Sequence, residues 1–179
     1  MFDTVLIAGL GLMGGSMAKT IKARTLSRVL GWNRTRATAE QALADGSIDA
    51  IATEALYKEA DLVIIGLYPQ ATVDWLLENM PKMKKGCVIV DMVGVKQFMV
   101  DHLEQAALDA GVHYVGGHPM AGREFSGLDF ALSTLFDGAS MIFVPTKSST
   151  ERVLEQLEAY FMSLGFGQTV RCTAQQHDH

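Results

Sequence analysis

One histidine lies in the glycine-rich stretch YVGGHPMAGREFSG, residues 114–127, where it could act as a general base. Imidazole exchanges a proton near neutral pH, which suits a side chain held beside a bound ligand. His118 follows a short apolar strand candidate, His113–Gly116, and Pro119 restricts the loop behind it. A lone histidine is more often structural than catalytic, so the residues alone leave both roles open for His118.

A second stretch, GLGLMG at residues 9–14, has the spacing of a phosphate-binding turn. It follows an apolar run and precedes a helical pattern, which is the context that the dinucleotide-binding GxGxxG motif requires. The three glycines allow a tight turn, a close approach of the backbone to a pyrophosphate, and close packing of helix on strand. The helix N-terminus adds free N–H groups. We predict that the dinucleotide is bound by Gly9, Leu10, Gly11, Leu12, Met13 and Gly14.

The residues after the second strand candidate bear on which dinucleotide binds. An acid that bonds the ribose 2′-hydroxyl of NAD is expected there, but the sequence has Asn33, followed by Arg34 and Arg36. A guanidinium can bind a 2′-phosphate with two hydrogen bonds, so these residues predict NADP, with NAD as the second choice. Alternatively, Asn33 caps a helix and both arginines are solvated.

Two further loops should end at the same edge of the sheet. Tyr68 and Pro69 follow the strand candidate Asp61–Leu67, and the segment 91–96 follows the candidate Cys87–Asp91. Residues of this kind are common in turns and helix starts, but at this edge they could also form the wall of the nicotinamide pocket. We therefore include Tyr68 and Pro69 among the predicted cofactor contacts.

The elements that must position these residues alternate along the whole chain. Short runs rich in Val, Ile and Leu are typical of strands covered on both faces of a parallel sheet, and amphipathic segments separate them. This rhythm predicts an α/β fold with a doubly wound, mainly parallel, Rossmann-like sheet. The strand candidates are Thr4–Ala8, Arg28–Trp32, Asp61–Leu67, Cys87–Asp91, His113–Gly116, Ser140–Val144 and Gln168–Cys172. The helix candidates are Gly15–Ala23, Arg36–Ala44, Ala71–Met80, Gln97–Ala110 and Thr150–Leu164, with glycine stops at Gly46, Gly86, Gly111 and Gly165.

Composition limits the kind of partner. The chain has 179 residues and a formal net charge of −5, with no basic run, which argues against a nucleic-acid partner. No apolar stretch is long enough for a membrane helix and no signal peptide begins the chain. Cys87 and Cys172 are far apart and form no CxxC pair, as expected in a reducing cytoplasm. His102, His113 and His118 have no spacing that suggests a metal cage, so we expect no metal.

Several motifs together resemble the prephenate dehydrogenase family of tyrosine biosynthesis. They are GLGLMGGS, DMVGVK, GGHPMAGRE followed by SG, and LFDGA before a strand that ends in proline. The resemblance covers essentially the whole chain and implies NAD(P)-dependent oxidative decarboxylation. It assigns the proton-accepting histidine to His118 and a position near the active-site mouth to Glu124. Some members carry a serine in the D-x-x-S-x-K loop, where this chain has Gly94, which leaves Gly94 a role in cofactor packing at most.

The resemblance also implies a domain organisation. Family members continue beyond the His177–Asp178 pair into an all-helical domain that forms a homodimer and supplies a basic residue for the substrate carboxylate. We therefore expect a dinucleotide-binding domain over residues 1–173 and the start of that helical domain over residues 174–179, without the rest of it. A homodimer is expected only with the helical domain.

The expected function is oxidation of prephenate or arogenate to 4-hydroxyphenylpyruvate or tyrosine, with carbon dioxide released. Two alternatives remain. A hydroxyacid-type dehydrogenase can also show NRT after the second strand, but the GGHPMAGRE stretch argues against it. A non-catalytic dinucleotide-binding module is the other.

Overall fold

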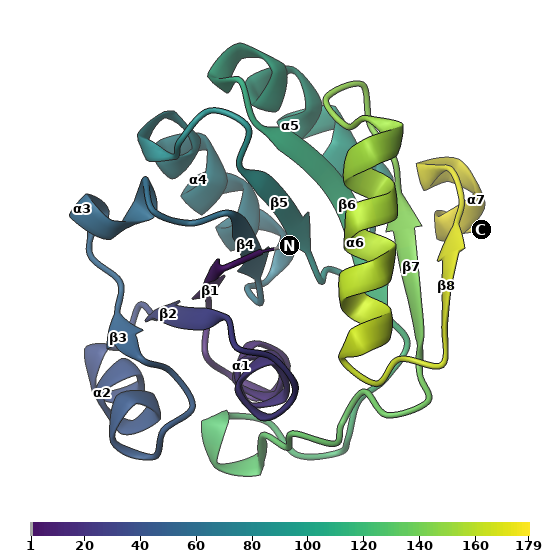
Figure 1. The fold of residues 1–179 in the computed structure, drawn as a ribbon. Coiled ribbons are helices and arrows are strands. Elements are labelled where there is room, and N and C mark those ends of the chain that lie inside the picture. Colours follow the sequence, from purple (N-terminus) through teal and green to yellow (C-terminus); the bar gives the residue numbers. More distant parts are fainter. Residues whose placement is uncertain (1) are drawn as a thin grey trace.

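Eight strands form one sheet in the order β3-β2-β1-β4-β5-β6-β7-β8 (Figure 1). The structure is a computed structural model that describes residues 2–179. Neighbouring strands are parallel except β6 and β7, which are antiparallel. The predicted doubly wound, mainly parallel α/β fold is therefore confirmed. The strands are β1 (Thr4–Ala8), β2 (Arg28–Trp32), β3 (Ala50–Ile51), β4 (Leu62–Ile65), β5 (Val88–Asp91), β6 (His113–Pro119), β7 (Ser140–Val144) and β8 (Gln168–Arg171).

Helices cover both faces of the sheet (Figure 1). Buried side chains of α1, α2 and α6 belong to one apolar cluster, and those of α3, α4 and α5 belong to the other. The helices are α1 (Leu12–Arg24), α2 (Arg36–Ala44), α3 (Glu54–Tyr57), α4 (Pro69–Asn79), α5 (Gln97–Ala110), α6 (Glu151–Ser163) and α7 (Ala174–Asp178), with short 3-10 turns at Met80–Lys82 and Leu128–Phe130.

The central strands divide their side chains between these two clusters. In β1, Val5 and Ile7 pack into one cluster, whereas Leu6 and Ala8 pack into the other. Successive side chains of a strand point to opposite faces, so a strand covered on both faces must be apolar at every position. This requirement explains the continuous apolar runs in the sequence.

The structure corrects several predicted boundaries. β3 and α3 were not predicted, because elements of two and four residues are too short to show a periodicity. The helix predicted from Gly15 begins at Leu12, so the last residues of the glycine motif form its first turn. The helix predicted from Ala71 begins at Pro69, a residue favoured in the first turn.

Strand β6 extends beyond its predicted end, and this changes the position of His118. The prediction ended the strand at Gly116 and placed the histidine on a loop. Instead, β7 pairs antiparallel with β6 from Gly116 to Pro119, and His118 lies opposite Ile142. The loop assignment of His118 was wrong because a partner distant in sequence extends the strand.

The strand order reverses between β1 and β4. From β1 the chain passes to β2 on one side, and β4 pairs with the other side of β1. Ligands of open parallel sheets bind at such a switch point, beyond the carboxyl ends of the strands. The N–H of Gly66 donates to the carbonyl of Ala8 at 2.7 Å, so the ends of β1 and β4 are in direct contact there.

Residues 2–179 contain neither a membrane-spanning helix nor a cluster of metal ligands. None of the helices in this range is both long and apolar enough to cross a bilayer. Nor do three or more His, Cys, Asp or Glu side chains in this range gather in a way that could hold a metal ion.

Candidate active site

The glycine turn at the end of β1 leaves open space above one of its three glycines. Gly9 has a φ of +94°, and a Cβ there would lie 2.6 Å from the carbonyl oxygen of Gly66. A Cβ on Gly14 would lie 1.7 Å from the carbonyl oxygen of Gly9. A Cβ on Gly11 would meet nothing within 4 Å. The packing of the chain therefore requires Gly9 and Gly14, whereas the space at Gly11 is a cradle of the kind that a pyrophosphate fills.

Asn33 connects the end of β2 to the glycine turn. Its Oδ1 accepts a hydrogen bond from the N–H of Leu10 at 2.9 Å, and its Nδ2 donates to the carbonyl of Thr35 at 3.0 Å. The N-cap of α2 is Thr35, so the alternative that Asn33 caps this helix is wrong. Arg34 and Arg36 are exposed, and the Arg36 guanidinium lies 3.3 Å from the Glu40 carboxylate.

The end of β4 lies beside this turn. Tyr68 is 86% exposed and is the N-cap residue of α4, and Pro69 is the first residue of that helix. The side chain of Leu67 packs toward the turn, where a Cβ on Gly9 would lie 2.8 Å from its Cδ2. Tyr68 and Pro69 thus stand at the carboxyl edge next to β1.

His118 stands near the carboxyl end of β6 and has different neighbours at its two ring nitrogens. Its Nδ1 lies 2.8 Å from Nε2 of His177 on α7. Its Nε2 faces Gly94, where a Cβ would lie 3.8 Å away, and Gly94 itself is exposed. Burial lowers the pKa of His118, the charges of His177 and Lys96 lower it further, and Asp91 opposes them. The lowered pKa favours the neutral imidazole at neutral pH, with Nδ1 beside His177 and Nε2 beside the exposed Gly94.

A buried acid beside the histidine fixes this part of the sheet. Asp91 accepts hydrogen bonds from the Tyr114 hydroxyl at 2.8 Å, from the N–H of Gly117 at 3.2 Å and from the N–H of Val93 at 2.9 Å. It also forms an ion pair with Lys96, and both side chains are fully buried. Burial lowers the pKa of Lys96, and the Asp91 carboxylate opposes this shift. The network therefore holds the end of β5 against β6 next to His118.

The sequence placed Asp91 and Lys96 in a segment that could form the wall of the nicotinamide pocket, but it did not predict that the two side chains pair inside the fold. One signal was present, because Asp91 ends the apolar run CVIVD and Lys96 follows five positions later. A charged residue in a fully covered strand needs a partner, since an unpaired buried charge is costly. The pairing itself depends on tertiary structure.

The glycine turn and His118 both lie at the carboxyl ends of the strands. In the sheet, β4 and β5 lie between β1 and β6, so three interstrand steps separate the two sites, roughly 14 Å at the usual strand spacing. The segment after β6 returns to α1, where the N–H of Leu132 donates to the Ser16 hydroxyl at 3.0 Å. Glu124 is exposed on this segment. A bound dinucleotide can therefore extend from the turn along the strand ends toward His118.

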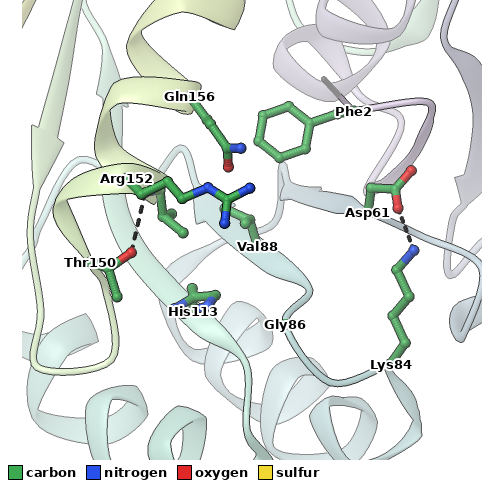
Figure 2. Close-up of a pocket in the computed structure, with 10 residues that line it drawn as sticks. Phe2, Asp61, Lys84, Gly86, Val88, His113, Thr150, Arg152 and Gln156 are labelled. Atoms are coloured by element: carbon green, nitrogen blue, oxygen red, sulfur yellow. Dashed lines mark hydrogen bonds and ion pairs between the residues drawn. The ribbon is translucent and has the colours of Figure 1, made fainter.

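A separate hollow of about 620 Å³ lies at the opposite edge of the sheet (Figure 2). Val88 and His113, which line it, begin β5 and β6, and Asp61 immediately precedes β4. Figure 2 shows the ion pair of Asp61 with Lys84 on one side of the hollow, and Arg152 of α6 on its other side. No predicted site residue lines this hollow, so it is distinct from the candidate site.

The family comparison agrees with the geometry of this edge. The model of the prephenate dehydrogenase nucleotide-binding domain matches residues 17–168. The chain belongs to the prephenate dehydrogenase family. The match covers β6 with His118 and the Asp91–Lys96 segment, whereas the glycine turn precedes its first residue.

Relatives of known name are similar across most of the chain. Prephenate dehydrogenase of Bacillus subtilis (strain 168) is 37% identical over 162 residues, which are 88% of this chain and 43% of that protein. The crystal structure of Synechocystis arogenate dehydrogenase superposes with a TM-score of 0.88 at 26% identity, over 98% of this chain and 61% of that one. The crystal structure of prephenate dehydrogenase from A. aeolicus, in complex with hydroxyphenyl propionate and NAD+, superposes with a TM-score of 0.89 at 25% identity. The superposition covers 99% of this chain and 62% of that one.

The comparisons also show the extent of the likeness. The chain spans less than two thirds of each of these prephenate and arogenate dehydrogenases and corresponds to their nucleotide-binding domain. The rest of those proteins, beyond the α/β part, has no counterpart in residues 1–179. A 3-hydroxyisobutyrate dehydrogenase from Mycobacterium tuberculosis shares the fold alone, with a TM-score of 0.76 at 16% identity.

Proposed function

We propose that this chain is the part of a prephenate or arogenate dehydrogenase that binds the dinucleotide and accepts the substrate proton. The observation that carries the proposal is the half-buried His118, whose Nε2 faces the exposed Gly94 at the same sheet edge as the glycine turn. The reaction is oxidative decarboxylation of prephenate to 4-hydroxyphenylpyruvate, or of arogenate to tyrosine. The A. aeolicus relative was crystallised with a hydroxyphenyl compound and NAD+, which supports this assignment.

The cofactor in this proposal is NADP, with NAD as the second choice. The open cradle at Gly11 would receive the pyrophosphate, and the first turn of α1 would offer it N–H groups. The partly exposed Leu12 and Met13 would lie beside it, and Leu10, whose side chain is buried in the core, would contribute only backbone. Tyr68, Pro69 and Gly94 would line the nicotinamide end of the cofactor. The exposed Arg34 and Arg36, in a segment without a carboxylate at position 33, favour the 2′-phosphate. When bound, the oxidised nicotinamide supplies the hydride acceptor.

The chain itself supplies a base and an ordered strand edge. His118 accepts the proton of the ring hydroxyl as a hydride leaves the ring carbon that bears this hydroxyl. The bond to the ring carboxylate breaks, carbon dioxide leaves, and the electron pair of that bond makes the ring an aromatic phenolate, which takes the proton back from His118 and becomes the phenol of the product. The lowered pKa of His118 keeps the imidazole neutral and able to take this proton. Glu124, on the segment after β6, is proposed to face the substrate.

The remaining parts of the proposal concern organisation and location. We assign residues 1–173 to the dinucleotide-binding domain and residues 174–179 to the beginning of the helical domain, through which a homodimer would form. The two free cysteines favour a reducing cytoplasm.

Calorimetric titration of NADP and NAD into this chain tests the proposal. We expect NADP to bind more tightly than NAD, and Gly11→Ala to weaken both with only a small decrease in melting temperature. NAD binding more tightly would contradict the NADP preference alone. If neither dinucleotide binds to a folded chain, the proposed function fails.

A further inference from the structure

The short helix α7 brings a histidine and an aspartate to the base. Its N-terminus is held by a capping box, in which Thr173 accepts a hydrogen bond from the N–H of Gln176 and the Gln176 side chain bonds back to the N–H of Thr173. At its other end, Asp178 accepts hydrogen bonds from the N–H of Lys96 at 2.9 Å and the N–H of Gln97 at 3.0 Å. The helix is therefore fixed against the start of α5, next to His118.

Hydrogen bonds link Asp178, His177 and His118 in a chain, in which each histidine donates toward Asp178. Nδ1 of His177 lies 2.8 Å from Oδ1 of Asp178, and Nε2 of His177 lies 2.8 Å from Nδ1 of His118. An ionised carboxylate can only accept hydrogen bonds, so Nδ1 of His177 carries the proton and its Nε2 has a lone pair. That lone pair accepts a hydrogen bond from the N–H at Nδ1 of His118. The remaining lone pair of His118 then lies on Nε2, which faces Gly94.

The carboxylate that begins this chain stays ionised. Partial burial disfavours its charge, but the hydrogen bonds from His177 and from the N–H groups of Gln97 and Lys96 lower the pKa of Asp178 to about 2. The other charged groups around His118 are the buried pair of Lys96, which lowers the pKa of His118, and Asp91, which opposes this shift. At neutral pH the direction of the hydrogen-bond chain is thus determined by Asp178.

We propose that His177 and Asp178 are positioning residues that hold His118 in the tautomer with its lone pair on Nε2. The proposal rests on the proposed function, in which His118 Nε2 takes a proton from the substrate hydroxyl. Gly94 carries no side chain that could orient this nitrogen, so the orientation comes from the Nδ1 side. When His118 takes the proton, the cation is stabilised through His177 by the Asp178 carboxylate.

Histidine ¹⁵N NMR spectra of the full chain, recorded without cofactor, test the proposal. In the unmodified chain we expect His118 to be mainly in the Nδ1–H form. In His177→Phe, which keeps a ring but has no acceptor, we expect the Nδ1–H form to lose its dominance. In His177→Gln, whose amide oxygen can accept the same hydrogen bond, we expect it to be retained. The matched control is His102→Phe, which removes an exposed histidine that bonds the carbonyl of Phe98.

A second measurement uses the reactivity of the lone pair. Diethyl pyrocarbonate acylates an unprotonated ring nitrogen, and peptide mapping locates the product. We expect His118 to react more slowly in His177→Phe than in the unmodified chain or in His177→Gln.

Two results would overturn the proposal. One is an Nε2–H tautomer of His118 in the unmodified chain, and the other is an equal tautomer distribution and reactivity in His177→Phe. Because neither measurement uses cofactor or turnover, failure here is distinguishable from failure of the proposed function, which the dinucleotide titration tests.

Discussion

At the scale of single residues, the two ring nitrogens of His118 have different surroundings. The Nδ1 side is occupied by His177 and the Nε2 side faces Gly94. Partial burial removes water that would stabilise the imidazolium, so the neutral base is favoured. In contrast, Arg34 and Arg36 are exposed and keep their charge available to a ligand. The proposed base is thus half-buried, whereas the proposed phosphate contacts are exposed.

The first prediction concerns pH and stability. The pKa of His118 in the folded chain is below its ordinary value of 6.5, mainly because of burial. Between the folded and unfolded pKa values the unfolded state binds more protons, so folding stability falls as the pH decreases below 6.5. We expect the free energy of unfolding, measured in urea at several pH values, to fall less steeply for His118→Asn. An equal slope in both proteins would contradict this assignment.

The second prediction concerns the choice of cofactor. Arg34→Ala should weaken NADP binding at least about tenfold, or ~1.5 kcal/mol, because a hydrogen bond to a charged phosphate is lost. NAD binding should not change, since NAD has no 2′-phosphate. The matched control is Arg152→Ala, because Arg152 lines the hollow at the opposite edge of the sheet. Equal weakening of both dinucleotides by Arg34→Ala would argue against a 2′-phosphate contact.

At the scale of elements, the junction of β1 and α1 explains why the glycines of the turn differ in their surroundings. Gly14 lies in the first turn of α1 and touches the carbonyl of Gly9, whereas Gly11 is the N-cap residue and borders open space. The turn is also tied to neighbouring strands, through the N–H of Gly9 to the carbonyl of Trp32 at 2.8 Å and through Asn33 to Leu10. Its shape is therefore determined by three strand ends together.

The third prediction separates these glycines. Gly14→Ala should destabilise the chain by at least ~2 kcal/mol, because its Cβ would overlap a backbone carbonyl that has no room to move. Gly11→Ala should cost less than ~1 kcal/mol, since only its N-cap preference changes. Dinucleotide binding should nevertheless weaken in Gly11→Ala. Thermal unfolding and calorimetric titration of the two variants would show this contrast, and a stable Gly14→Ala would refute it.

At the scale of the whole molecule, the buried charged side chains of residues 2–179 are one pair, Asp91 and Lys96. The sheet separates two large apolar clusters, and Asp91 joins β5, β6 and the start of α5 between them. Within residues 2–179, no buried side-chain nitrogen or oxygen lacks a hydrogen-bond partner. Removal of one member of the Asp91–Lys96 pair would therefore leave a buried charge without its partner.

The fourth prediction concerns this buried pair. Lys96→Met leaves the buried Asp91 carboxylate without its cation and should lower the free energy of unfolding by about 3–5 kcal/mol. The matched control is Lys82→Met, which removes a partly exposed partner of Glu54 and should cost less than ~1 kcal/mol. Urea unfolding of both variants measures the difference. Similar losses in the two would show that the buried pair has no special weight.

Part of this protein could be predicted from its sequence by itself. Continuous apolar runs and glycine stops determined the strand and helix alternation, because a strand covered on both faces has no polar position to offer. The predicted stops at Gly46, Gly111 and Gly165 follow helix ends and have positive φ, whereas Gly86, also at positive φ, lies in the turn before β5. The spacing of Gly9, Gly11 and Gly14 likewise placed a turn at the end of β1, since local backbone sterics are sufficient to define it.

Only the tertiary structure decided which distant residues meet. The antiparallel pairing with β7 carried His118 into a strand, the β5–β6 contact paired Asp91 with Tyr114, and α7 brought His177 to His118 across 59 positions of the chain. None of these contacts leaves a periodic pattern in the sequence. They depend on strand order and on where the chain returns, which follow from the burial of all apolar faces at once rather than from any local segment.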